Sequence, residues 1–348
     1  MASGNGDAEP PATVTIDPRG DLLLIVGETK QPVLVSARVL QVACEVFRAM
    51  LGPNFKEGQE LERHNVQNSG PYTLPLPDEE PEPMEVLCRV LHHSYHQLYE
   101  KAMSMDLLTS VAAVADKYDC ASALYYPATV WLEAKLQLAT TLGHESLLAI
   151  ALQLDSPHVF RKISQNLILN WGGSYERLAN KGNIDATVLY QVQEQRQAAW
   201  NAINNTLFAH TRLLQSRLDY GSASCHTESI SLVSRAHREI CKPCMIAQPL
   251  LVIGFQKALQ DLNLWPLPTT QSITISIGKL STLREKDCHT YHSSNKIYVG
   301  GTNCSCFPTP KELMDTITTV VAAATPGLCL DCIKAGAKQA SGCRVAHN

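Results

Sequence analysis

The hydrophobic pattern near the start of the chain predicts a small β-sheet. The stretch DLLLIVGE, residues 21–28, is a short and nearly continuous apolar run closed by a glycine, which is typical of a strand buried on both faces. PVLVSA, residues 32–37, follows closely enough to pair with it as a hairpin. Apolar residues alternate in YTLPL, residues 72–76, and predict a third strand. The prolines around it favour an edge of the sheet, because proline cannot donate to a strand ladder.

Apolar residues three and four positions apart predict a helix between the second and third strands. In VSARVLQVACEVFRAMLGPNFKEG, residues 35–58, Ser36 is the expected N-cap, and Gly52 and Pro53 are expected to end the helix. A polar loop, QELERHNVQNSGP, is expected to follow. The apolar stripe of the helix would consist of Val39, Leu40, Ala43, Phe47, Met50 and Leu51.

Two more helices are expected after the third strand. The acidic residues at 78–82 favour a helix N-terminus, where the helix macrodipole prefers negative charge. The run MDLLTSVAAVADKYDCASAL, residues 105–124, repeats the helical spacing. The buried faces predicted for the two helices are Met84, Leu87, Val90 and Leu91, and then Leu108, Val111, Ala112, Ala115 and Tyr118.

Composition and charge narrow the function classes. The chain has 348 residues, of which 45% are hydrophobic and 18% charged, as is ordinary for a packed globular protein. Residues 1–17 are mostly small, polar or proline and predict a disordered lead. The net charge of -4 supplies no basic field, so nucleic acid is not a predicted partner. Neither a signal-peptide pattern nor a long apolar run occurs, so no membrane segment is predicted and an intracellular, cytoplasmic or nuclear protein is expected.

Four blocks carry a resemblance to a known family: DLLLIVG, VSARVLQVACEVFRAMLGPNFKEG, LPLPDEEPEPMEVLCRVLHH and VAAVADKYDC. In wording and order they resemble the BTB (POZ) domain in the form common in filamentous fungi, over residues 18–135. The resemblance implies a small sheet covered by helices, with exposed apolar surfaces that bind other proteins, often a second copy of the domain. It implies no catalytic residue. A homodimer and a cullin-type ligase scaffold are the partners that it suggests.

The rest of the chain divides into two parts by its pattern. Residues 136–217 continue with apolar residues at helical spacing and predict a helical extension. Residues 218–348 predict a small mixed domain. Within it, QSITISIG suggests a strand in which Ile273, Ile275 and Ile277 alternate, KIYVG suggests a second strand, and TPKELMDTITTVVAA suggests a helix that begins at Thr309 and Pro310. The expected fold class is therefore α+β.

Cysteines are the candidate chemistry of this last part. Nine of the twelve cysteines lie there, in the motifs CKPC, CSC and CLDC and singly. Because two CxxC knuckles suit a tetrahedral zinc ion, one predicted structural zinc site consists of Cys241, Cys244, Cys329 and Cys332. A second site would draw on Cys288, His292, Cys304 and Cys306. The 84 residues between Cys244 and Cys329 exceed the usual knuckle spacing, so free thiols and redox or disulfide chemistry stay open.

Other chemistry has weaker support in the sequence. His92, His93 and His96 in LHHSYHQ could bind a metal on one helical face, since His92 and His96 are four positions apart, but a solvated helix end is the preferred interpretation. Neither a hydrolase motif nor a phosphate-binding motif occurs. We therefore expect a non-enzymatic interaction adaptor with a cysteine-rich C-terminal domain. The alternatives are a transcription or ubiquitin-ligase adaptor and, in another class, a CxxC redox enzyme.

Overall fold

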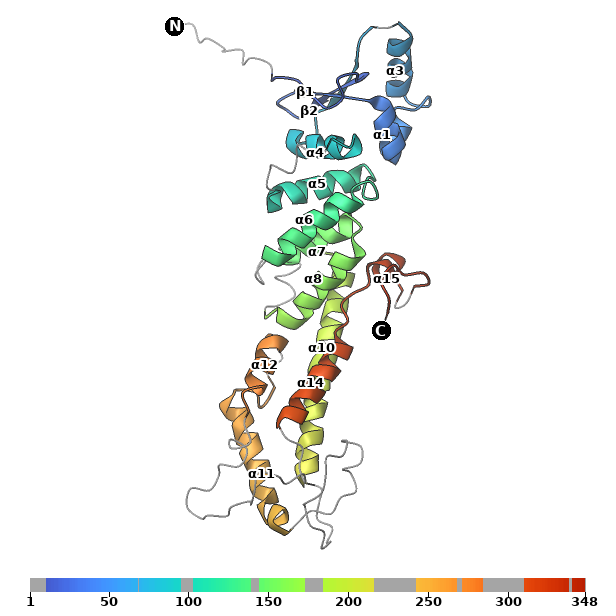
Figure 1. Ribbon diagram of the computed structural model, residues 1–348. Coiled ribbons are helices and arrows are strands. Elements are labelled where there is room, and N and C mark those ends of the chain that lie inside the picture. The colour runs from blue at the N-terminus through green and yellow to red at the C-terminus, as the bar shows by residue number, and fades with distance from the viewer. Residues whose placement is uncertain are drawn as a thin grey trace, which may run out of the picture. The chain divides into compact units, whose positions relative to one another are not determined.

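We describe a computed structural model of the chain (Figure 1). It describes residues 11–67, 69–94, 103–138, 144–172, 184–215, 242–267, 271–283, 310–337 and 340–347. Its contacts divide the chain into two compact units. The first contains the residues up to Ile163 together with Cys329–Val345, and the second consists chiefly of Ser164–Leu328. The expected domain boundaries are at residues 135 and 217, whereas the division by contacts lies after Ile163, inside a helix. The same division assigns Cys329, Cys332 and Cys343 to the first unit.

A mixed four-stranded sheet forms the N-terminal part of the first unit (Figure 1). Its order is β1-β3-β2-β4, with β2 antiparallel to β3 and parallel to β4. The predicted hairpin and the edge position of the third predicted strand are therefore confirmed. The strands are β1 Val14–Thr15, β2 Leu22–Val26, β3 Gln31–Val35 and β4 Tyr72–Leu76.

Order begins earlier than the composition suggested. Strand β1 runs parallel to β3, with Val14 opposite Val33, although it belongs to the segment expected to be disordered. Ile16, which follows β1, is buried, and its backbone N–H donates to Leu34 O at 3.0 Å. Pairing with β3 therefore orders the end of this segment, although the composition of residues 1–17 predicts too little apolar surface for a fold of its own. Residues 1–10 lie outside the described residues.

The first helix is broken into two. Helices α1 (Ala37–Ala43) and α2 (Glu45–Met50) are separated by Cys44, whose backbone is extended at φ -140° and ψ 121°. The expected N-cap is confirmed, because the Ser36 side chain accepts from the backbone of Val39. The Cys44 sulfur accepts from Phe47 N at 3.4 Å and donates to Tyr118 O at 2.9 Å. The sulfur therefore satisfies the Phe47 N–H, which an uninterrupted helix would have satisfied itself, and also a carbonyl at the C-terminal end of α5.

A helix replaces the expected polar loop. Helix α3, Lys56–Gln67, buries only Gly58 and Leu61 and exposes charged residues elsewhere. A Cβ atom at Gly58 would lie 1.9 Å from the carbonyl oxygen of Gly52, so α3 begins in direct backbone contact with the turn before it. The loop prediction was wrong because this helix buries only two residues, so its sequence has no repeating apolar positions that would indicate a helix.

The later helices of the first unit follow the predicted pattern. All nine residues predicted for the buried faces of α4 (Pro81–Leu91) and α5 (Met105–Lys117), Tyr118 included, are buried. Tyr118 joins the two helices to α2: its ring stacks on Phe47 at 4.7 Å, and its hydroxyl donates to Glu79 Oε1 at 2.9 Å. The helices that continue the chain are α6 Tyr125–Leu138, α7 His144–Gln153 and α8 Pro157–Asn170.

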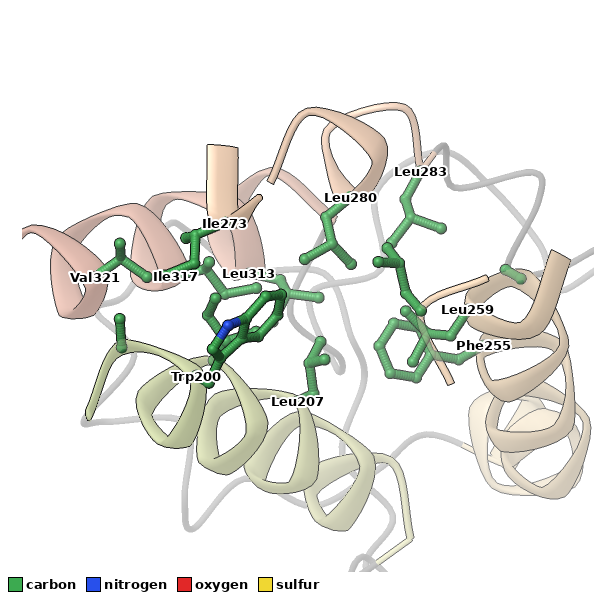
Figure 2. Close-up of a cluster of buried hydrophobic side chains, with 14 of the residues drawn as sticks. Trp200, Leu207, Phe255, Leu259, Ile273, Leu280, Leu283, Leu313, Ile317 and Val321 are labelled. Atoms are coloured by element: carbon green, nitrogen blue, oxygen red, sulfur yellow. The ribbon is translucent and has the colours of Figure 1, made fainter. Parts of the chain in front are cut away.

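The second unit is helical in its described residues. Its helices are α10 Ala186–Gln215, α11 Lys242–Asp261, α12 Ile273–Leu280 and α14 Pro310–Ala324. Figure 2 shows their apolar side chains pointing into one core, with Trp200 and Leu207 from α10 facing residues such as Ile317 from α14. The predicted helices over α10 and α14 are confirmed. The buried Arg196 adds a polar link, since its Nη2 donates to Gln271 O at 2.6 Å.

The strand predicted at Ile273–Ile277 was wrong. The Ser272 hydroxyl accepts from Ile275 N at 3.3 Å and caps helix α12. Ile273 and Leu280, seven positions apart, are buried, whereas Ile275 is 59% exposed. The three alternating isoleucines suggested a strand, but the helical spacing becomes visible only when Leu280, which lies after the QSITISIG stretch, is included. The predicted strand KIYVG lies outside the described residues, and all strands within the described ranges belong to the first unit.

Among the helices that the structure describes, none combines the length and apolar character needed to cross a bilayer.

Candidate metal centre

The C-terminal segment brings three cysteines together. Cys329 is the N-cap residue of helix α15 (Leu330–Ala335), and Cys332 lies inside the helix. The helix ends at Gly336, whose left-handed backbone (φ 61°) turns the chain away. Residues 340–347 then bring Cys343 back beside the helix.

The four donor atoms of this segment have the spacing of a metal site. The sulfurs of Cys329, Cys332 and Cys343 and a ring nitrogen of His347 all lie within 4.8 Å of one another. The sulfurs of Cys332 and Cys343 are 3.6 Å apart. Zinc–sulfur bonds of about 2.3 Å in a tetrahedron place two sulfurs roughly 3.8 Å apart, whereas a disulfide needs about 2 Å. The sulfur spacing therefore fits a four-coordinate metal ion such as zinc, and the three cysteines are free thiols here.

Backbone groups orient the sulfurs. Ala340 N donates to Cys332 Sγ at 3.3 Å, and Cys343 Sγ donates to Ala340 O at 3.2 Å. Burial by itself would raise the pKa of the Cys329 thiol, but hydrogen bonds from the Cys332 backbone and the neighbouring thiols lower it below its usual range. Burial and the same neighbours raise the pKa of Cys343 to about 12. Cys329 is therefore deprotonated more readily than Cys343, and a bound cation would displace the protons that the thiol ligands carry.

An ion-pair network flanks the cysteines. Arg344 follows Cys343 directly, and its guanidinium contacts Asp331 at 2.6 Å and both carboxylate oxygens of Asp155 at 2.7 and 2.9 Å. Lys334 contacts Asp155 at 2.6 Å. Two cations thus meet two carboxylates beside the sulfurs, and all four of these residues belong to the first unit.

The structure places only part of the predicted site set. Cys329 and Cys332 lie together as expected from the CLDC motif. Cys244 lies in α11, but its side chain is outside the described residues. The predicted zinc site that pairs CKPC with CLDC therefore stays a prediction. The predicted site residues that lie wholly outside the described ranges are Cys241, Cys288, His292, Cys304 and Cys306.

Cys343 and His347 were missed as ligands. The prediction paired CLDC with a second CxxC motif, whereas here the partners are a cysteine eleven positions after Cys332 and a histidine four positions after that cysteine. The spacing C-x2-C-x10-C-x3-H fits within residues 329–347 and needs no folded insertion. This compact spacing is the feature of the sequence that could have identified Cys343 and His347 as ligands.

The histidines in LHHSYHQ do not form a metal site in the described residues. His92 Nδ1 lies 2.8 Å from Cys88 O, and its Nε2 accepts from Ser36 N at 3.0 Å. Both nitrogens of the ring are thus engaged with the backbone. His93 is exposed, and His96 lies outside the described residues.

A groove lies between α1 and α3 in the first unit. Its volume is 540 Å³, and its lining combines apolar residues such as Leu51, Leu61 and Val66 with the charged Asp21, Arg38 and Glu62. Val66 on α3, one of the lining residues, is 81% exposed.

Comparisons with known proteins give no further guide: no protein-family model matches this chain, and no curated protein or solved structure matches it.

Proposed function

We propose that the C-terminal segment binds one structural zinc ion through Cys329, Cys332, Cys343 and His347. The observation that carries this proposal is the convergence of three sulfurs and a ring nitrogen within 4.8 Å. Thiolate and imidazole ligands favour zinc over magnesium or calcium, and four protein ligands leave no open position for a substrate. The role of the ion would be structural, since it would hold helix α15 to the turn at residues 340–347.

Metal analysis of the purified full-length protein tests the zinc proposal. We expect Cys343→Ser to remove one zinc per chain and, after cobalt substitution, to weaken the thiolate-to-metal absorption bands. Cys120→Ser is the matched control, because Cys120 lies in the first unit but not in the metal cluster, and its thiol donates a hydrogen bond to Tyr118 O. Equal zinc contents in the wild type and Cys343→Ser would refute the proposal, whatever the cysteines outside the described residues bind.

For the whole chain we propose a non-catalytic interaction protein that acts through a BTB-like first unit. The resemblance over residues 18–135 implied a small sheet covered by helices, and the mixed sheet with helices α1 to α5 supports the proposal in that coarse form. Self-association is the favoured mode, and docking to a cullin-type scaffold or to a transcription partner is the alternative within the same class.

The groove between α1 and α3 is the surface proposed for self-association. The lining includes the exposed Val66 beside Leu51 and Leu61, and Arg38 and Glu62 offer opposite charges to a second copy. We expect light scattering of the full chain to show a dimer that Val66→Glu weakens. Val130→Glu on α6, a valine that is 60% exposed and lies outside the groove lining, serves as the control. A wild-type monomer at high concentration would exclude self-association.

A further inference from the structure

Asp155 occupies a fixed corner of the first unit. It lies in the turn between α7 and α8 with a left-handed backbone (φ 50°). Its N–H donates to Leu152 O at 3.3 Å, and the next N–H, of Ser156, donates to Ala151 O at 2.9 Å. The turn is therefore closed by its own backbone bonds. The carboxylate is left to contact groups outside the turn.

Both arms of the candidate zinc site meet at this carboxylate. The first arm is helix α15, which supplies Cys329 and Cys332 and also Lys334, whose Nζ lies 2.6 Å from Asp155 Oδ1. The second arm is the turn at residues 340–347, which supplies Cys343 and, next to it, Arg344. The guanidinium of Arg344 binds Asp155 through two nitrogens, at 2.7 and 2.9 Å.

The two arms are also joined directly, beside the sulfurs. Asp331 lies between the two cysteines of α15 in sequence and accepts from Arg344 Nη2 at 2.6 Å and from Arg344 N at 2.8 Å. The bond from the Arg344 backbone fixes the chain immediately after Cys343. One relative placement of the two arms thus brings the sulfurs together, forms the Asp331–Arg344 ion pair and places Lys334 and Arg344 on Asp155.

We propose that zinc binding and docking of residues 329–345 on Asp155 are coupled, so that zinc loading strengthens the docking of the segment on the α7–α8 turn and zinc loss weakens it. The proposal rests on the proposed zinc site and adds a positioning residue that is not a ligand. Its physical basis is reciprocity: if Asp155 favours the arrangement of the arms that zinc needs, zinc must favour docking on Asp155 by the same factor.

The size of the coupling follows from the exposure of the pairs. Side-chain exposure is 43% for Arg344, 47% for Lys334 and 29% for Asp155, so water and salt screen each contact. Outer contacts of metal sites typically change metal affinity about 10- to 100-fold, and screening by water and salt lowers the expected effect of this network to about tenfold or less. We expect Asp155→Asn to weaken zinc binding about three- to tenfold at low salt, and by less at high salt.

The test is a competition of the full-length protein against a chromogenic zinc chelator. Asp155→Asn is compared with the wild type and with Asp116→Asn, which makes the same chemical change at an exposed site on α5. Lys334→Met provides a second variant that removes a contact to Asp155 from the other side and leaves the turn intact. Hydrogen exchange of residues 329–337 and 340–347, with and without the chelator, reports docking directly.

The outcomes separate the coupling from the zinc site itself. Weaker zinc binding in Asp155→Asn and Lys334→Met, unchanged binding in Asp116→Asn and faster exchange of both arms after zinc removal are the expected results. A wild type that binds zinc with the same affinity as both contact variants would overturn the coupling and leave the zinc site standing. A wild type that binds no zinc would overturn both.

Discussion

The backbone N–H of Ser36 donates a hydrogen bond of 3.0 Å to Nε2 of His92, 56 residues later in the chain. Because Nε2 is the acceptor, the ring proton lies on Nδ1 and points to Cys88 O, 2.8 Å away. The N-cap residue of α1 is thus tied to the C-terminal end of α4 by a neutral imidazole. A second ring proton would point at the N–H of Ser36, so this contact requires the neutral form.

The His92 contact should make the first unit sensitive to acid. Burial lowers the pKa of His92 below its usual value of about 6.5. The unfolded chain therefore binds more protons between the folded and unfolded pKa values, so the stabilisation is complete above about pH 6.5 and is lost as the pH falls through the folded pKa. Urea unfolding at several pH values should show this loss in the wild type. His92→Gln should cost about 1 kcal/mol near pH 8 and flatten the profile.

His93 is the control for that experiment. It is exposed, and its backbone has a positive φ of 54°, which asparagine tolerates. His93→Asn should keep the acid sensitivity of the wild type. If His92 titrates by NMR at the usual histidine value of about 6.5, the neutral ring is not required.

A second acid-sensitive histidine is expected in the second unit. His210 on α10 is 8% exposed, its ring lies 4.8 Å from the ring of Phe255, and burial lowers its pKa to about 4. Glu312 opposes that shift only weakly. Because the folded pKa is lowered, stability should fall by a few kcal/mol as the pH drops from about 6.5 towards 4. Tryptophan fluorescence during unfolding should show this fall for the wild type and not for His210→Leu.

Helix α12 can be distinguished from the strand expected at the same residues by two isoleucines. Ile273 is fully buried in the core shown in Figure 2, whereas Ile275 is 59% exposed. Ile273→Ala should cost about 2–4 kcal/mol of unfolding free energy, and Ile275→Ala less than about 1. In a half-buried strand the two residues would share one face. Equal costs in denaturant unfolding would therefore contradict the helix.

Two helical glycines should respond in opposite ways to alanine. At Gly58 the new Cβ would lie 1.9 Å from Gly52 O, a backbone atom that cannot move aside easily. Gly58→Ala should destabilise the first unit by about 2 kcal/mol or more, measured by thermal unfolding. Gly278 on α12 has nothing within 4 Å of the same position. Gly278→Ala should be neutral or stabilising by up to about 1 kcal/mol, because alanine has the higher helix propensity. A similar loss of stability at both sites would contradict the explanation by backbone contact at Gly58.

Local patterns in the sequence determined most of the helices and the hairpin. Ser36 acts as an N-cap, the prolines of β4 lie at the sheet edge, and the buried faces of α4 and α5 contain the predicted residues. These features depend on neighbours within a few positions, where periodicity and capping chemistry operate. The CLDC knuckle was predicted as a ligand pair for the same reason.

The tertiary structure decided the features that depend on distant contacts. Cys44 interrupts the first helix because its sulfur finds the carbonyl of Tyr118, 74 residues away, and Ile273 begins a helix whose buried face is defined by α14 and α11. Likewise, Cys343 joins Cys332 because Arg344 is held by Asp331 and Asp155. The sequence alone named the cysteines that could bind a metal. Folding selected their partners, because a metal site requires atoms to meet in space and spacing along the chain constrains that only within a short loop.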